Sequence, residues 1–157
     1  MTTNSLVSVN EIIDLHRHTV ALWHQTEIVN SYSGCLELVC EQHRFNYLLW
    51  HEEDIARSPD ASDARIAAVK RAIDRYNQRR NDAIEKIDDF LIARLQEQGC
   101  QPAAGARINT ETPGSTIDRL SILSLRLYQR KIQASSRNRS AAFELALQSK
   151  RTYQAGA

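Results

Sequence analysis

The chain has 157 residues, of which 42% are hydrophobic and 25% are charged, and its formal net charge is +1. It contains only 5 Gly and 3 Pro, whereas average usage would give roughly nineteen of the two together. A β-sandwich or barrel needs a turn about every 8–12 residues, and a doubly wound α/β fold needs glycine-bearing loops. Both classes are excluded, so we expect an all-α protein with a single helical domain over residues 1–157.

The first two helices are predicted over about residues 8–30 and 35–57. Ser8 can cap the first helix while Glu11, three residues on, completes a capping box. Apolar residues recur at intervals of three and four along both segments. The second helix is expected to stop before Pro59, because the residue preceding a proline is pushed out of the α region.

A third helix is predicted over 62–98, with Ser62 or Asp63 as its cap and Gly99 just beyond its end. Its roughly 36 residues would give a rod of about 54 Å at 1.5 Å per residue. A compact globule of this length has a diameter of about 40 Å. The monomer is therefore elongated or the overhang packs against another subunit, and we favour a homodimer.

The remaining chain is expected to form a loop over 99–112, a helix over 113–135 and a short final helix over 140–152. Pro113 suits the first helical position, with Thr112 as the cap. The predicted architecture is an elongated bundle of four to five helices with one very long central helix.

Charge is distributed unevenly along the chain. Residues 1–60 carry 3 basic and 9 acidic side chains, whereas residues 119–157 carry 8 basic and 1 acidic side chain. We expect the basic segment to dock on the acidic first third of its own or a partner chain. Nucleic-acid binding is disfavoured, because the cations alternate with a helical apolar stripe and few aromatic side chains are present to stack on bases.

Cysteine use and the absence of long apolar runs indicate the compartment. The three cysteines, Cys35, Cys40 and Cys100, are odd in number and lack C-x-x-C spacing, which argues against a disulfide framework. The N-terminus does not read as a secretory signal, and no apolar run approaches the roughly 20 residues of a membrane span. We expect a cytoplasmic protein with reduced thiols and no membrane span.

Polar residues stand where the second and third helices are expected to pack. The short turn makes these helices antiparallel, so paired positions should sum to about 120 and form one polar strip. A buried amide needs hydrogen-bond partners, which makes asparagine costly at such a seam. The candidate ligand-binding residues are His43, Asn46, Trp50, His51, Glu52 and Asp54 on one side, and Asp74, Asn77, Asn81 and Glu85 on the other.

Two interpretations of this strip stay open. It can form a pocket for a small anionic or metal-associated ligand, with His43, His51 and Asp54 as candidate ligands of a divalent metal. It can equally fix helix register and dimerisation, as a buried asparagine does in coiled coils. No zincin, P-loop or dinucleotide motif occurs, and a single E-x-x-D at Glu85 is weak, so no residue is assigned a catalytic role.

The run Asn109-Thr110-Glu111-Thr112-Pro113-Gly114-Ser115 opens the fourth predicted helix. Free N–H groups at a helix start suit an anion, and Glu111 and Arg119 complete this second candidate site. An ordinary capped helix start is the favoured interpretation.

Three runs together resemble a known family: FNYLLWHEEDIAR (45–57), KRAIDRYNQRRND (70–82) and NTETPGSTIDRLSI (109–122). They are similar to the bacterial "domain of unknown function 4254" family. The resemblance covers the chain from the first to the fourth helix but not the last 20 or so residues. It implies a small, all-helical bacterial protein without an established activity, and it marks the polar constellations as family signatures without assigning them a role.

Overall fold

The computed structural model describes residues 6–155, with side chains through residue 142. Four helices make up this part of the chain: α1 (Val9–Trp23), α2 (Cys35–Ala56), α3 (Asp63–Glu97) and α4 (Pro113–Ala155). The all-α class is confirmed for these residues, whereas the outermost ends of the predicted 1–157 domain lie outside them. None of these helices is long and apolar enough to cross a membrane.

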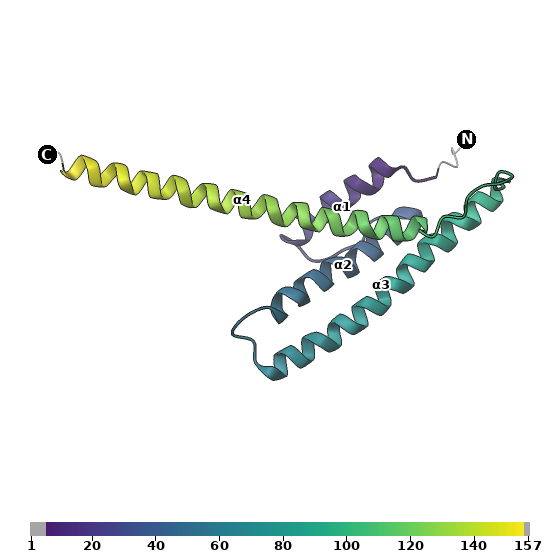
Figure 1. Cartoon of the computed structure of the whole chain (residues 1–157), viewed down its shortest axis with the longest axis horizontal. Helices are drawn as coiled ribbons and strands as arrows, with labels where there is room; N and C mark the ends of the chain where they lie inside the picture. The colour runs from purple at the N-terminus through teal and green to yellow at the C-terminus, as the bar shows by residue number, and fades with distance from the viewer. Residues whose placement is uncertain (1–5, 156–157) are drawn as a thin grey trace.

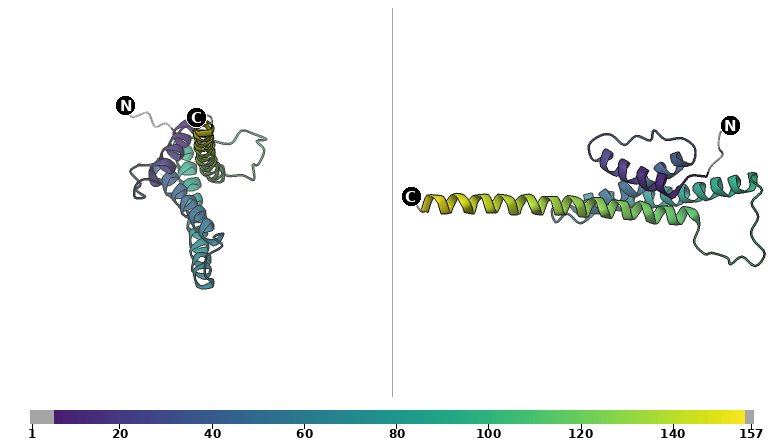
Figure 2. Two further views of the ribbon diagram at one scale, coloured as in Figure 1. Left: turned by 90° about the vertical axis from the view of Figure 1, so that its left-hand side faces the viewer. Right: turned by 90° about the horizontal axis from the view of Figure 1, so that it is seen from above.

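The body of the molecule is an antiparallel α2–α3 hairpin with α1 and the first half of α4 packed beside it (Figure 1). The second half of α4 leaves the body and projects away from it, as Figure 1 and the right-hand view of Figure 2 show. The buried core draws on every helix, and its largest contributions come from α1 and α2. Its main apolar cluster comprises Ile12, Leu15, Val20, Trp23, Val39, Cys40, Tyr47, Ile87, Ile117 and Leu125.

Local sequence signals place most helix ends where they were predicted. The Ser8 Oγ accepts from the Glu11 N–H at 3.2 Å, while the Glu11 carboxylate accepts from the Ser8 N–H at 2.8 Å, so the capping box is confirmed. The Ser62 hydroxyl caps α3 by accepting from the Arg65 N–H at 3.2 Å. Gly99 follows the end of α3 with φ of 69°, the left-handed conformation that favours glycine at this position.

The first helix is shorter than predicted. It ends at Trp23 instead of continuing to residue 30. Beyond this end, the Thr26 and Asn30 side chains bond to backbone carbonyls, as Thr and Asn commonly do in turns and loops. The Thr26 hydroxyl donates to the Leu22 carbonyl at 3.1 Å, and the Asn30 amide donates to the Glu37 carbonyl at 2.9 Å.

The two helices predicted over 113–135 and 140–152 are one continuous helix. α4 has 43 residues against 35 for α3, so the longest helix is the one that leaves the body and not a central one. No Gly or Pro occurs between residues 115 and 155. The polar residues near 135–140 have only modestly lower helix propensity than alanine, which is insufficient to break the helix.

Candidate functional site

A group of polar side chains is buried where α1, α2 and α4 meet. We call it the buried polar cluster, and its members are His16, Gln42, His43, Asn46, Asp118 and Ser121. All are buried except Asp118, which is half-buried. On α2, Asn46 lies three residues after His43 and four after Gln42, so these side chains share one helix face, and Asp118 and Ser121 lie about one turn apart near the start of α4.

Hydrogen bonds in this cluster join α2 to α4. The Asn46 amide donates to Asp118 Oδ1 at 2.8 Å and to Ser121 Oγ at 3.0 Å. The Gln42 amide also donates to Asp118 Oδ1, at 2.5 Å. His43 Nδ1 is hydrogen-bonded to the same Ser121 Oγ at 2.6 Å. Buried polar groups paired in this way fix the position of α4 relative to α2.

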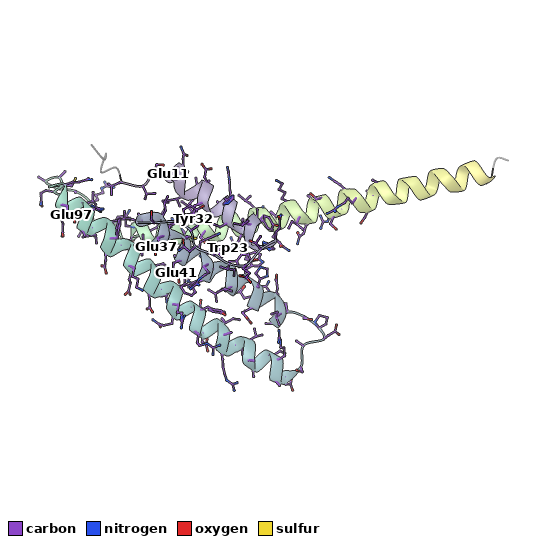
Figure 3. The ribbon with its side chains drawn as sticks, turned by 180° about the vertical axis from the view of Figure 1, so that it is seen from behind. Glu11, Trp23, Tyr32, Glu37, Glu41 and Glu97 are labelled. Carbon is purple, nitrogen blue, oxygen red and sulfur yellow. The ribbon has the colours of Figure 1, made fainter. Side chains whose placement is uncertain are left out.

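His16 occupies the α1 side of the cluster and is 1% exposed. Neither of its ring nitrogens has a hydrogen-bond partner among the described residues. Its ring lies 4.5 Å from that of His43, which in turn stacks on Trp23 at 5.4 Å (Trp23 is labelled in Figure 3). An unpaired buried polar group is costly, so His16 is the member of the cluster that most needs an explanation.

Both buried histidines are neutral at pH 7. Burial lowers the pKa of His16 to about 4. The pKa of His43 lies well below its ordinary value because of burial and then because of the neighbouring His16. Desolvation disfavours the charged imidazole in each case.

A second histidine group lies farther along the same interface, where His24, Tyr47, His51 and Tyr128 contact one another. The His51 ring lies 4.4 Å from Tyr47 and 5.1 Å from His24, and His24 lies 4.5 Å from Tyr128. Burial lowers the pKa of His51, the neighbouring His24 lowers it further, and Asp54 opposes the shift. His51 is therefore a partly buried aromatic contact.

The polar strip predicted between α2 and α3 is not assembled. The α2 face that carries His43 and Asn46 is turned toward α1 and α4, whereas Phe45, on another face, packs toward Tyr76 of α3 with ring centroids 6.5 Å apart. Sequence spacing gave the antiparallel pairing of the two helices but not their rotation about their axes. On the α3 side, Asp74, Asn81 and Glu85 are exposed and Asn77 is half-buried.

The remaining α2 candidates lie near the end of that helix. Trp50 and Glu52 are half-buried, and Asp54 is exposed beside Arg57, with 3.5 Å between the charged groups. Of the three candidate metal ligands, Asp54 is close enough to His51 to influence its pKa, whereas His43 is bonded to Ser121 in the buried polar cluster. No group of three or more His, Cys, Asp or Glu side chains in the described part of the chain is placed to hold a metal ion.

The NTETPGS run forms a capped helix start that is docked on α3. Thr112 and Ser115 exchange hydrogen bonds at 3.0 and 3.1 Å. The Gly114 N–H donates to Asp88 Oδ1 at 2.7 Å, and a Cβ at Gly114 would lie only 2.6 Å from the Ile84 carbonyl oxygen. Asp88 thus takes one of the N–H groups that the helix start would have offered to an anion.

Glu111 and Arg119, the other candidates at this helix start, pair with each other. Their charged groups are 2.6 Å apart, with the Arg119 side chain 68% exposed. The pair holds the end of the preceding loop against the first turns of α4. Such an exposed pair contributes little to stability.

A groove of about 720 Å³ runs between α1 and α4, and sequence reasoning did not anticipate it. We call it the α1–α4 groove. It is lined by residues of both helices: Ile13, His16, Arg17, Val20 and Ala21 of α1, and Leu120, Leu123, Ser124, Leu127, Tyr128, Lys131, Ile132, Ser135 and Arg139 of α4. Leu123, Leu127 and Ile132 are 49%, 52% and 42% exposed there. The apolar stripe of α4 was visible in the sequence, but its lack of a covering helix was not.

Comparison with known proteins assigns the chain to a family. The family described as "Protein of unknown function (DUF4254)" matches residues 36–155, which span α2, α3 and α4 as far as Ala155. No curated protein and no solved structure matches the chain. The match includes the α2 and α4 members of the buried polar cluster, the α4 side of the groove and the projecting half of α4. The chain belongs to the DUF4254 family.

Proposed function

We propose that this protein is a homodimeric assembly module in which α4 connects the two copies. The observation that supports this most is the exposure of every residue from 131 to 142 on a helix that continues away from the body to Ala155 (Figures 1 and 2). Helices without tertiary contacts are only marginally stable in water, since packing of an apolar face supplies most helical stability in proteins. A packing partner for this half of α4 would supply that stability.

The charge pattern of α4 favours a partner over a self-supporting helix. Solitary helices gain stability from ion pairs between residues three or four apart. The sequence from 119 to 143 holds six cations and no Asp or Glu, so such pairs cannot form within it. The chain's own acidic residues, such as Glu11, Glu37 and Glu41 in Figure 3, lie on the body that α4 leaves behind.

The buried polar cluster serves the assembly by fixing where α4 points. Its amide and hydroxyl bonds from α2 to Asp118 and Ser121, together with the bond from Gly114 to Asp88 of α3, hold the first turns of α4 from two sides. Buried polar contacts of this kind specify helix register in coiled coils. The register role predicted for polar residues between α2 and α3 is thus assigned to the contact between α2 and α4.

Sedimentation equilibrium of the full chain tests the proposal. The wild type should be a dimer, and Leu127→Glu should raise the dimer dissociation constant by about tenfold or more, because it places a charge among interface apolar groups. Ile92→Glu is the matched control, since both side chains are 52% exposed on helices and Ile92 lies on α3 away from the groove. A monomeric wild type, or equal effects of the two variants, would overturn the proposal.

A second candidate function is the binding of a small amphipathic anion in the α1–α4 groove. It is favoured by the buried His16 ring, whose nitrogens are unpaired within the described chain and which lines an apolar groove that also carries Arg17, Lys131 and Arg139. Pockets for small molecules commonly have such a volume and a few polar groups among apolar ones.

Dodecanoate is a suitable probe for this second function. It should raise the melting temperature of the wild type, and the Lys131→Gln/Arg139→Gln variant should abolish the shift. Arg126→Gln/Arg137→Gln removes the same charge from exposed α4 positions outside the groove and should retain it. No shift in the wild type, or the same loss in both variants, would reject ligand binding.

We also propose that the protein is cytoplasmic, and the state of its cysteines supports this. Cys35, Cys40 and Cys100 are all free. Structural disulfides are typical of oxidising compartments, whereas free thiols are typical of reducing ones.

A further inference from the structure

We propose that the groove between α1 and α4 of each copy is filled by residues 141–147 of α4 from the other copy. This inference rests on the proposed dimer and identifies its interface. The groove presents Leu123, Leu127 and Ile132, each 42–52% exposed. Neighbouring exposed apolar side chains of this size on a soluble body indicate a surface that another element covers.

The sequence of the projecting half of α4 supplies a matching element. Residues 141–147 read Ala-Ala-Phe-Glu-Leu-Ala-Leu, so six of seven are apolar. Ala141 and Ala142 are exposed. This run cannot fold back onto the groove of its own chain, because α4 is one continuous helix whose earlier turns form a wall of that groove. A second copy can bring the same run to it.

Two-fold symmetry makes the exchange reciprocal. An axis perpendicular to α4 near Ala134 sets residues 141–147 of one copy level with Ser121–Leu127 of the other. In a two-fold interface the same surface serves both copies, so each groove receives the run that the other copy offers. The small residues Ala134, Ser135 and Ser136 then lie where the two α4 helices cross, which allows their backbones to approach closely.

Charge complementarity supports this register. Glu144 is the only acidic residue from 119 to 157, and the axis places it level with the part of the groove that contains Arg17. Arg17 lines the groove and forms no ion pair among the described residues. The cations Lys150 and Arg151 come level with the start of α1, which carries Glu11 and Asp14.

A charge-swap experiment on the full chain tests this pairing. Glu144→Arg and Arg17→Glu should each raise the dimer dissociation constant measured by sedimentation equilibrium about tenfold, as close charge pairs at interfaces do. The double variant Arg17→Glu/Glu144→Arg should return to within about threefold of the wild type. Arg65→Glu/Glu144→Arg has the same net charge, but its added carboxylate lies in the first turn of α3, at the end of the α2–α3 hairpin that points away from α1 (Figure 1). Its dimer should therefore stay as weak as that of Glu144→Arg alone.

The outcomes separate this inference from the dimer itself. A wild-type dimer whose dissociation constant is unchanged by Glu144→Arg, or a double variant as weak as the singles, overturns the exchange and leaves the dimer standing. A monomeric wild type overturns both. Circular dichroism melting of each variant shows that lost association does not come from unfolding.

Discussion

Lowering the pH from 7.5 to 5.5 should destabilise the protein through His16. The pKa of this buried ring is about 4 in the folded state, against an ordinary value of 6.5. Because the folded pKa is the lower one, the unfolded chain binds more protons between these values. The stability is therefore fully present above pH 6.5 and is lost as the pH falls toward 4.

The magnitude follows from the two pKa values. Linkage gives a loss of about 1.3 kcal/mol between pH 7.5 and 5.5 and about 3.4 kcal/mol once the pH is below 4. His43 and His51 act in the same direction, since burial lowers the pKa of both. The loss from His16 alone is thus a lower bound on the total histidine effect.

Urea unfolding at a fixed protein concentration and a series of pH values measures this loss. His16→Phe keeps a ring in place but removes the titration, so its stability should fall by about 1.3 kcal/mol less than that of the wild type over the same interval. His18→Phe makes the same substitution at an exposed position of α1 and is the matched control for the change of residue. Equal pH dependence in wild type and His16→Phe would refute the reasoning.

Three further predictions concern single positions. Gly114→Ala should cost about 1–3 kcal/mol in thermal or urea unfolding, because its Cβ would meet a backbone oxygen of α3 at 2.6 Å; an unchanged melting temperature would contradict this docking. Ser121→Ala should cost about 1–3 kcal/mol by leaving buried partners unpaired, whereas Ser124→Ala, which removes a local bond to a carbonyl at 2.7 Å, should cost less. Cys100, which is exposed, should be alkylated quickly by iodoacetamide. Cys40 is buried, and burial raises the pKa of its thiol to about 12, so it should react only on unfolding. Equal labelling of the two in the native state, measured by mass spectrometry, would show that Cys40 is accessible.

Local signals made the helix boundaries predictable where a side chain caps the backbone. Ser8, Ser62, Gly99 and Thr112 all mark ends as expected, because each acts on its own neighbouring residues. The end of α1 was not predictable from periodicity, since apolar residues continue to Ile28 while the chain has already turned.

The buried polar cluster could be predicted only in part. His43 and Asn46 were recognised as polar residues on an apolar helix, but their partners Asp118 and Ser121 are 72–78 residues away in sequence. Which face of α2 meets which helix depends on the packing of the whole body, and spacing alone does not determine it. His16 carried no local signal at all, because a histidine within an amphipathic helix reads equally well as surface.

The hydrogen bonds that hold the first turns of α4 to α2 and α3 have a mechanical consequence. The helix extends about 63 Å from Pro113 to Ala155, at 1.5 Å per residue, without an interruption. A tilt of about 5° at its start would move its far end by about 5 Å, which is a full helical pitch. Small displacements of Asp88 or Ser121 are therefore magnified along the helix, so a change near the base of α4 shifts the position of its far end relative to the body.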